Sequence, residues 1–264
     1  MHFLIIIEYL IIIFLYSIVS LYFLVICKTK IAIIFILLKL FDIFGPPIFL
    51  KDFLRKKIKK YVKKNANCNK IKRKKNAIYL IVPHGATFFP IIQLPLLLDM
   101  EDEYPIVCIN KWFLLIPGFV GILKFFSGFI STEKGNLKIA ILQKARPLII
   151  YPNGAEEALY NSCKNKKIRI LDIKEKFLQH LFASKRYIHI VMIKNESECF
   201  FFNDFVIMLY RFINNFIDVG IPFPLPYFSG KKLKMHISKA INTSKIDNID
   251  QLKKIIREKV DDLR

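Results

Sequence analysis

Two short segments of this chain combine a strand-like apolar run with residues that can carry out acid–base chemistry. In the first segment, the apolar residues 78–82 end at Pro83, and His84 and Gly85 follow directly. A neutral imidazole has a pKa close to neutral pH and can take a proton from a hydroxyl group. Gly85 would leave room for a substrate to approach. The alternative interpretation is a histidine that only caps a turn.

The second segment, residues 148–157, also runs from apolar residues into a turn and then into two acids. Asn153 and Gly154 form the turn, and Glu156 and Glu157 follow, in what would be the first turn of a helix. Backbone amides of such a turn can stabilise a tetrahedral oxyanion. A carboxylate can orient a catalytic histidine through its second ring nitrogen. An ordinary strand–turn–helix with N-terminal acids is the alternative.

Alternating strand and helix patterns place both segments at strand ends. Short apolar runs predict strands at residues 78–82, 105–109, 128–131, 147–151, 188–193 and 232–237. Helical patterns lie at residues 87–100, 113–126, 134–145, 174–184 and 247–262. This order predicts βαβ units and an α/β fold with a mixed, mostly parallel sheet flanked by helices. Ligands bind such open sheets at the carboxyl ends of the strands.

Large apolar side chains dominate the first fifty residues. Residues 3–27 contain Glu8 as their only charge and are long enough to cross the roughly 30 Å hydrocarbon core of a bilayer. A signal peptide is disfavoured because there is no basic n-region and no small-residue cleavage site. Residues 31–50 are apolar too, but single charges and a Gly-Pro-Pro sequence interrupt them. We predict a transmembrane or re-entrant helical anchor over residues 1–50, most simply a hairpin.

Residues 51–75 hold the densest positive charge of a chain whose formal net charge is +21. Leu54, Ile58 and Tyr61 recur there at helical spacing, which predicts a basic amphipathic helix lying on anionic lipid. A solvated linker whose charge only sets the topology is the alternative. The combination of positive charge and high apolar content fits a membrane surface better than a nucleic-acid partner. By the positive-inside rule this flank is cytoplasmic.

Neither a metal site nor a disulfide framework is predicted. The five cysteines are widely spaced, and no Cys-x-x-Cys motif or His/Cys cluster occurs. Reduced thiols in a cytosol-facing domain are the simple interpretation. The chain also lacks the G-x-S-x-G elbow of lipases and the glycine-rich fingerprints of nucleotide-binding folds.

The two segments resemble motifs of the glycerolipid acyltransferases, most closely the type 2 diacylglycerol acyltransferase family with its monoacylglycerol and wax-ester relatives. Those enzymes carry a His-Pro-His-Gly motif and later a Gly-Gly-Ala-x-Glu motif. Residues 83–85 match the end of the first motif, and Val82 replaces its first His. Residues 153–157 match the second motif, with Asn153 in place of its first Gly. Phe89 stands where related phosphate-ester acyltransferases have an Asp, which favours the diacylglycerol branch.

The resemblance covers roughly residues 77–242 and the apolar N-terminal segment. It implies an O-acyltransferase that moves a fatty acyl group from acyl-CoA to a lipid hydroxyl, most simply of diacylglycerol or monoacylglycerol in triacylglycerol synthesis. His84 would be the general base, and Glu157 its supporting carboxylate. Glu157, as an acid that follows a turn, is not expected to belong to the core. The implied oxyanion or substrate site contains Gly85, Asn153, Gly154 and Lys134, with Lys111 and Lys138 as further candidates for the phosphates of coenzyme A.

These interpretations lead to a three-part organisation: an anchor at 1–50, a juxtamembrane segment at 51–75 and an acyltransferase domain at 76–264. We expect acyl-CoA, a lipid acceptor and the membrane as partners, no nucleic acid and no cofactor or metal. A homodimer is compatible with the sequence. The expected location is the endoplasmic reticulum membrane, with the catalytic domain facing the cytosol. A lysophospholipid or glycerol-phosphate acyltransferase is the alternative enzyme, and a non-catalytic membrane-anchored lipid-binding protein is the alternative class. The Phe- and Pro-rich residues 199–228 are expected to contact lipid or the acyl chain.

Overall fold

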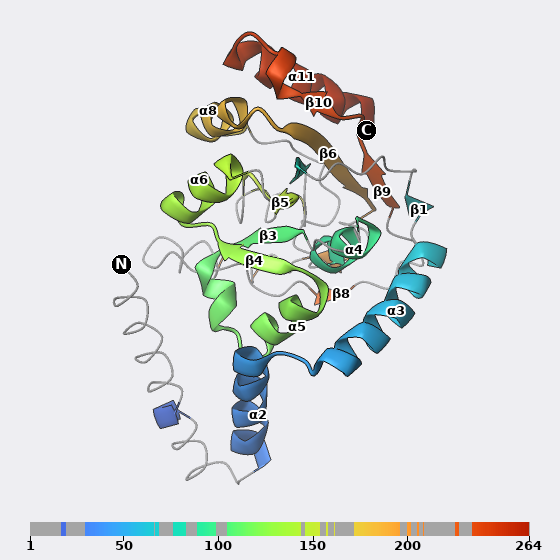
Figure 1. The fold of residues 1–264 in the computed structure, drawn as a ribbon, viewed down its shortest axis with the longest axis vertical. Helices are drawn as coiled ribbons and strands as arrows, with labels where there is room; N and C mark the ends of the chain where they lie inside the picture. Colours follow the sequence, from blue (N-terminus) through green and yellow to red (C-terminus); the bar gives the residue numbers. More distant parts are fainter. Residues whose placement is uncertain are drawn as a thin grey trace.

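The computed structural model shows a mixed, mostly parallel β-sheet between two layers of helices (Figure 1). The strand order is β1-β9-β6-β2-β5-β3-β4, and β10 pairs with β6 beside this path. The predicted α/β sheet is therefore confirmed. The residues that the structure describes are 17–19, 30–65, 67–68, 76–82, 89–98, 105–143, 146–153, 157, 161, 172–195, 200–201, 205, 208, 225–226 and 234–263.

Five mutually parallel strands form most of the sheet, up to the edge strand β4. They are β2 (Ala77–Ile81), β3 (Ile106–Ile109), β4 (Gly128–Ser131), β5 (Leu148–Ile150) and β6 (Tyr187–Lys194). All five agree in position with predicted strands. Their apolar, β-branched residues suit strands that helices cover on both faces.

Shorter strands complete the sheet on the β6 side. β9 (Lys234–Ile237) runs antiparallel to β6, and β1 (Asn67–Cys68) extends the sheet beyond β9. β10 (Ile241–Asn242) also pairs with β6. A separate two-stranded sheet joins β7 (Phe200–Phe201) to β8 (Leu225–Pro226). The sequence predicted β9 but not the two-residue strands around it and in the Phe-rich region, because so few residues carry no periodic pattern.

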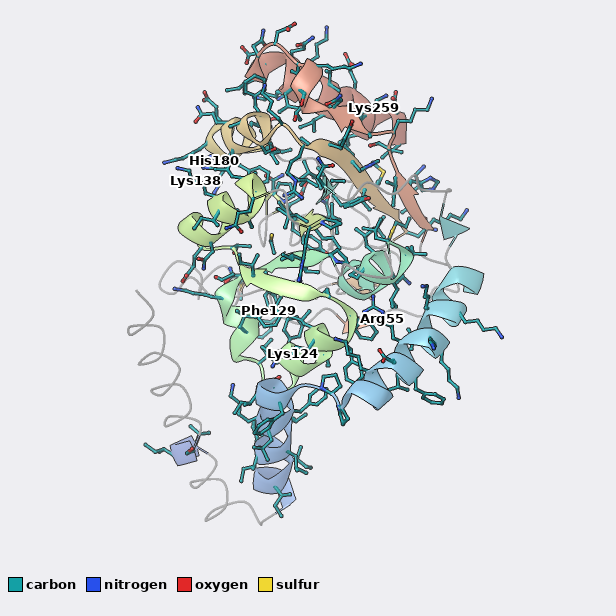
Figure 2. All side chains as sticks on the ribbon, in the orientation of Figure 1. Arg55, Lys124, Phe129, Lys138, His180 and Lys259 are labelled. Carbon is teal, nitrogen blue, oxygen red and sulfur yellow. The ribbon has the colours of Figure 1, made fainter. Side chains whose placement is uncertain are left out.

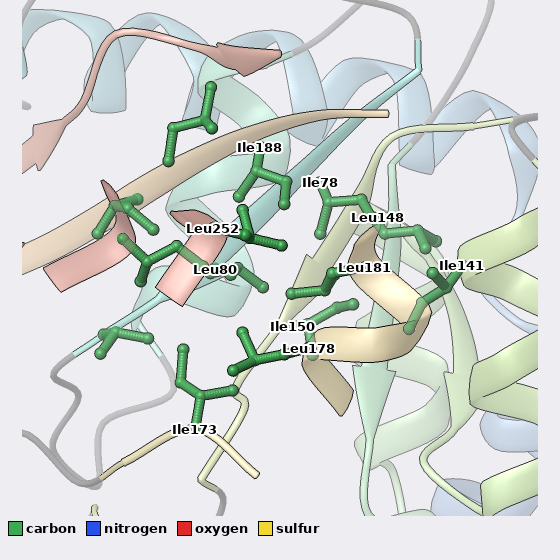
Figure 3. Close-up of a cluster of buried hydrophobic side chains, with 14 of the residues drawn as sticks. Ile78, Leu80, Ile141, Leu148, Ile150, Ile173, Leu178, Leu181, Ile188 and Leu252 are labelled. Atoms are coloured by element: carbon green, nitrogen blue, oxygen red, sulfur yellow. The ribbon is translucent and has the colours of Figure 1, made fainter. Parts of the chain in front are cut away.

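One face of the sheet packs against α6 (Lys134–Leu142), α8 (Glu175–Ser184) and α11 (Ile249–Leu263). Figure 3 shows this cluster, in which Ile78, Leu80 and Ile150 of the strands meet side chains such as Leu178 and Leu252 of the helices. The other face packs against α4 (Phe89–Leu97), the short 3-10 helix η1 (Lys111–Leu115) and α5 (Phe119–Phe126). Alternate residues of the same strands supply the two cores, as the two-residue period of a strand requires.

The helix predicted over residues 113–126 is two helices. η1 and α5 are separated by a turn in which Gly118 has a φ of 82°, a left-handed conformation that glycine adopts without strain. Pro117, directly before it, cannot donate a hydrogen bond to a continuous helix. The predicted helices that correspond to α4, α6, α8 and α11 are confirmed, with ends that differ by a few residues.

The two helices described between residues 30 and 65 are connected at Gly45, which has a φ of 70°. They are α2 (Lys30–Phe44) and α3 (Ile48–Asn65), and α3 crosses the predicted boundary at residue 50. Among the helices that the structure describes, none is both long and apolar enough to pass through a bilayer. Most of the predicted span at residues 3–27 lies outside the described residues.

The fully buried Arg186 ties three segments together at the amino edge of the sheet. Its guanidinium donates to Asn76 O and Ala77 O at the start of β2 and to Arg146 O before β5. It also donates to two carbonyls at the end of α6, those of Ala140 and Ile141. Burial lowers the pKa of Arg186 to about 10, so the side chain stays charged at neutral pH.

Candidate active site

The two motif segments leave neighbouring parallel strands at the same edge of the sheet. Leu80 of β2 lies opposite Ile150 of β5 in the register, so both strands reach their carboxyl ends at the same level. Val82, two residues before His84 in the chain, still donates from its backbone to Val191 O of β6 over 3.0 Å. His84 and Gly85 themselves lie outside the described residues. The carboxyl ends of β2 and β5, from which the two motif segments continue, therefore lie side by side although they are far apart in the sequence.

The described helices α4 and α8, which follow β2 and β5 in the chain, cover opposite faces of the sheet. Figure 1 shows α4 and α8 separated by the sheet. In open α/β sheets, ligands bind beyond the carboxyl ends of such a pair of strands. The strand order places this switch point between the two motif-bearing strands.

Glu157 is completely buried, with 0% of its surface exposed, so the expectation that it lies outside the core is wrong. It occupies a helical position, and the buried Asn161 lies four residues later, also in helical conformation. Both polar side chains are therefore buried in this part of the chain. A carboxylate is retained at such depth only with polar partners. Asn161 was missed from the sequence, although its four-residue spacing from Glu157 was a usable signal.

The turn after β5 is described as far as Asn153. Tyr151, Pro152 and Asn153 are half-buried just beyond the carboxyl end of β5. Gly154 lies outside the described residues. The assignment of the Asn153–Gly154 turn to an oxyanion site therefore stays a prediction.

The three lysines considered for coenzyme A lie on different elements. Lys111 opens η1 just after β3, and its Nζ lies 3.6 Å from an oxygen of Glu133, which follows β4. Lys134 is the first residue of α6, and Lys138 is exposed one turn later on the same helix (Figure 2). Of these, Lys111 is closest in the strand order to the switch point, because β3 pairs with β5. Both charges of the Lys111–Glu133 pair are more than half exposed, so the pair adds little stability.

The described part of the chain has no residues suited to metal binding or to a cysteine nucleophile. Within it, no group of three or more His, Cys, Asp or Glu side chains is arranged to hold a metal ion. Cys108 of β3 is free and buried, and burial raises the pKa of its thiol to about 12. This thiol is therefore protonated at neutral pH and cannot serve as a nucleophile.

If Glu157 orients His84 as the resemblance implies, Glu157→Gln is expected to lower kcat by about 10- to 10⁴-fold, the range from partners of metal-bound histidines to the acid of a catalytic triad. The amide keeps the size of the buried side chain but cannot stabilise a protonated imidazole. Glu157→Ala is expected to lower stability as well, by roughly 2–4 kcal/mol, because it leaves a cavity and unsatisfied partners. Glu175→Gln, at an exposed acid in the first turn of α8, is the control for steady-state kinetics and thermal unfolding. A Glu157→Gln protein with unchanged kcat would remove this carboxylate from the mechanism.

No protein-family model matches the chain, and a search of curated proteins also finds no match. Among solved structures, the fold is similar to the crystal structure of the 1-acyl-sn-glycerophosphate (LPA) acyltransferase, PlsC, from Thermotoga maritima. The superposition has a TM-score of 0.49 and a sequence identity of 15%, and it covers 92% of this chain and 93% of that chain.

Proposed function

We propose that this protein is a membrane-bound O-acyltransferase that moves a fatty acyl group from acyl-CoA to the hydroxyl of diacylglycerol or monoacylglycerol. The observation that carries the proposal is the position of the two motif segments. They follow adjacent parallel strands, β2 and β5, at the same edge, and the described helices α4 and α8 that come later lie on opposite faces. Residue types suited to acyl transfer thus coincide with the usual ligand position of an open α/β sheet.

In the proposed reaction, the acceptor hydroxyl attacks the thioester carbonyl and His84 takes the hydroxyl proton. The tetrahedral intermediate places a negative charge on the former carbonyl oxygen, and backbone amides of the Asn153–Gly154 turn stabilise it. When the intermediate collapses, the carbon–sulfur bond breaks and the imidazolium returns the proton to the leaving thiolate of coenzyme A. Glu157 stabilises the imidazolium during this cycle.

The two N-terminal helices support a membrane location. α2 exposes a series of large apolar side chains, and α3 beside it carries the exposed Lys56, Lys57 and Lys60. Arg55, which the sequence grouped with these cations, is buried and donates to Phe125 O over 3.4 Å. It therefore anchors α3 to α5 and cannot contact lipid headgroups. We further propose that the surface belongs to the endoplasmic reticulum membrane, with the sheet on the cytosolic side.

Neutralising the three exposed lysines of α3 is expected to weaken binding to anionic vesicles. Each cation near an anionic surface contributes about 1 kcal/mol, so Lys56→Gln, Lys57→Gln and Lys60→Gln together should lower the partition coefficient on the order of 100-fold at low salt. The control replaces three exposed lysines elsewhere with glutamine: Lys174 at the N-cap of α8, Lys176 within α8 and Lys254 on α11. Flotation with liposomes of graded anionic content measures the difference. Equal losses in both triple variants would mean that only net charge matters.

The function is tested by incubating membranes that contain the protein with labelled oleoyl-CoA and a panel of acceptors. The panel contains diacylglycerol, monoacylglycerol, a long-chain alcohol, lysophosphatidate and glycerol 3-phosphate. Label in triacylglycerol or diacylglycerol supports the proposal. Label only in phosphate-bearing products would assign the chain to the alternative enzyme branch. Absence of label from every acceptor, in a protein that binds the vesicles, would support a non-catalytic lipid-binding role.

A further inference from the structure

The carboxyl-terminal part of α2 is attached to α5 by hydrogen bonds that run in both directions. The two carboxylate oxygens of Asp42 accept from backbone N–H groups of α5, at Gly118 and Gly121, each over 2.8 Å. In return, the Nζ of Lys124 donates to Asp42 O over 2.5 Å and to Ile43 O over 2.8 Å, near the end of α2. The N–H groups at the start of α5 and the carbonyl groups near the end of α2 lack partners within their own helices, and here they bond to side chains of the other helix. We call Asp42 and Lys124 the double cap.

The charges of the double cap match the dipoles of both helices. Asp42 is 5% exposed and lies at the N-terminus of α5, where the helix dipole favours a negative charge. Lys124 lies at the C-terminus of α2, where the dipole favours a positive charge. A buried carboxylate is costly unless its oxygens accept hydrogen bonds, so Asp42 favours one placement of α2 on α5.

Steric fit reinforces this placement. A Cβ added at Gly121 would lie 2.1 Å from Cδ1 of Phe41, and one added at Gly118 would lie 2.9 Å from Cδ2 of Leu38. The two glycines therefore allow α2 to approach α5 more closely than any other residue type would. Leu38, Phe41 and Asp42 follow helical spacing, so together they define the face of α2 that contacts α5.

The remaining surface of α2 is strongly apolar and exposed. Ile34, Leu37 and Phe44 are 54%, 58% and 79% exposed. Ile33, Ile36, Leu40 and Ile43 are exposed as well. Figure 1 shows α2 projecting from α5 on the side opposite the sheet, with α3 adjoining it. α3 begins at Ile48, shortly after α2 ends, and carries exposed lysines, so the occupant that fits the two helices is a lipid layer with anionic headgroups.

α5 connects this lipid-facing helix to the sheet. It follows η1, which begins just beyond the carboxyl end of β3, and only Ser127 separates it from β4. Figure 2 shows Lys124 where α5 meets α2, and Arg55 where α5 meets α3. α5 therefore contacts both N-terminal helices, and α3 also packs against α4 through Ile58 and Leu97.

We propose that Asp42 and Lys124 are positioning residues that hold α2 in one orientation to the sheet, so that the carboxyl edge reaches acceptors within a lipid layer. This proposal rests on the proposed acyltransferase function. The double cap does not shape the site itself. Its loss should therefore affect acceptors that reside in lipid and spare acceptors that reach the site from water.

The test compares two acceptors, a long-chain diacylglycerol in anionic vesicles and a short-chain diacylglycerol dissolved as monomers. Asp42→Asn places an amide donor against the N–H groups of α5, and Gly121→Ala pushes Phe41 away without changing charge. Because Ala is a better helix former than Gly, the second variant does not weaken α5 itself. The controls are Asp250→Asn, at an exposed acid of α11, and Gly135→Ala, where a Cβ would meet nothing within 4 Å.

Asp42→Asn and Gly121→Ala should each lose at least about tenfold in kcat/KM for the vesicle-borne acceptor and stay within about twofold for the dissolved one, since 1.36 kcal/mol corresponds to a factor of ten. The controls should match the wild type with both acceptors. Equal losses with the two acceptors would show a purely structural role and overturn the proposal, and so would unchanged rates with both.

Hydrogen–deuterium exchange of the vesicle-bound full chain gives a readout that does not depend on turnover. Asp42→Asn and Gly121→Ala should speed exchange in α2 while the amides of β2 and β6 stay protected. Unchanged exchange in α2 would overturn the double cap as the holding device. A wild type that acylates neither acceptor would refute the proposed function, and the exchange result alone would then decide whether the double cap holds α2.

Discussion

Replacement of His84 by alanine is expected to reduce acyl transfer by about 10²- to 10⁴-fold, the usual contribution of a positioned general base. Without the imidazole, the acceptor hydroxyl must lose its proton to water while it attacks the thioester. The variant should still fold, because the apolar residues of β2 that hold the sheet together end at Val82, before His84. Initial rates with labelled oleoyl-CoA and the preferred acceptor measure the effect.

His84→Gln separates proton transfer from simple polarity. Glutamine keeps a polar side chain of similar reach but cannot accept a proton near neutral pH, so this variant should be as inactive as His84→Ala. His180→Ala on α8 is the matched control, because His180 is half-buried and lies on a helix that packs on one face of the sheet. Full activity in His84→Ala, with normal binding to membranes, would show that His84 is not the general base and that the proposed mechanism is wrong.

The centre of the sheet was predictable because its signal is local. Each parallel strand is a short run of apolar residues bounded by turn residues, and both faces are covered, so the runs are nearly continuous. The motif residues were found in the same way, since each set follows directly after such a run. The sequence did not show that β2 and β5 are neighbours, because this depends on the strand order of the sheet and no single segment of the sequence determines that order.

Features that depend on contacts between distant residues could not be predicted. Glu157 was expected to lie outside the core because it follows a turn, but its burial depends on what the rest of the chain places around it. Asp42 was an interruption in an apolar run, and its partners Gly118 and Gly121 lie far along the chain. Arg55 looked like one more cation of the basic segment until its bond to Phe125 O was visible. In each case the residue type was known and the partner was not.

Arg186→Met is expected to be the most destabilising single substitution outside the candidate site, at about 3–5 kcal/mol. Its guanidinium donates to five backbone carbonyls from the start of β2, the end of α6 and the turn before β5. Methionine fills a similar volume but leaves these carbonyls without their donor, and each buried acceptor left unsatisfied costs roughly 1–3 kcal/mol. The full sum is not expected, because water can reach some carbonyls at the sheet edge once the site loosens. The loss is still a large part of the roughly 5–15 kcal/mol that stabilises a typical domain.

Arg186→Lys tests whether the geometry of the donors or the charge alone is responsible. An ammonium keeps the charge but has three donors on a single nitrogen, so it cannot reach carbonyls from three directions as the planar guanidinium does. We expect roughly half the loss seen with methionine, together with the local opening of the end of α6. Arg257→Met is the control, because its ion pair with Asp172 is more than half exposed on both sides and should contribute under about 1 kcal/mol. Urea unfolding in a mild detergent, followed by circular dichroism, gives the three values, and a methionine variant no less stable than the Arg257 control would show that Arg186 does not hold the amino edge together.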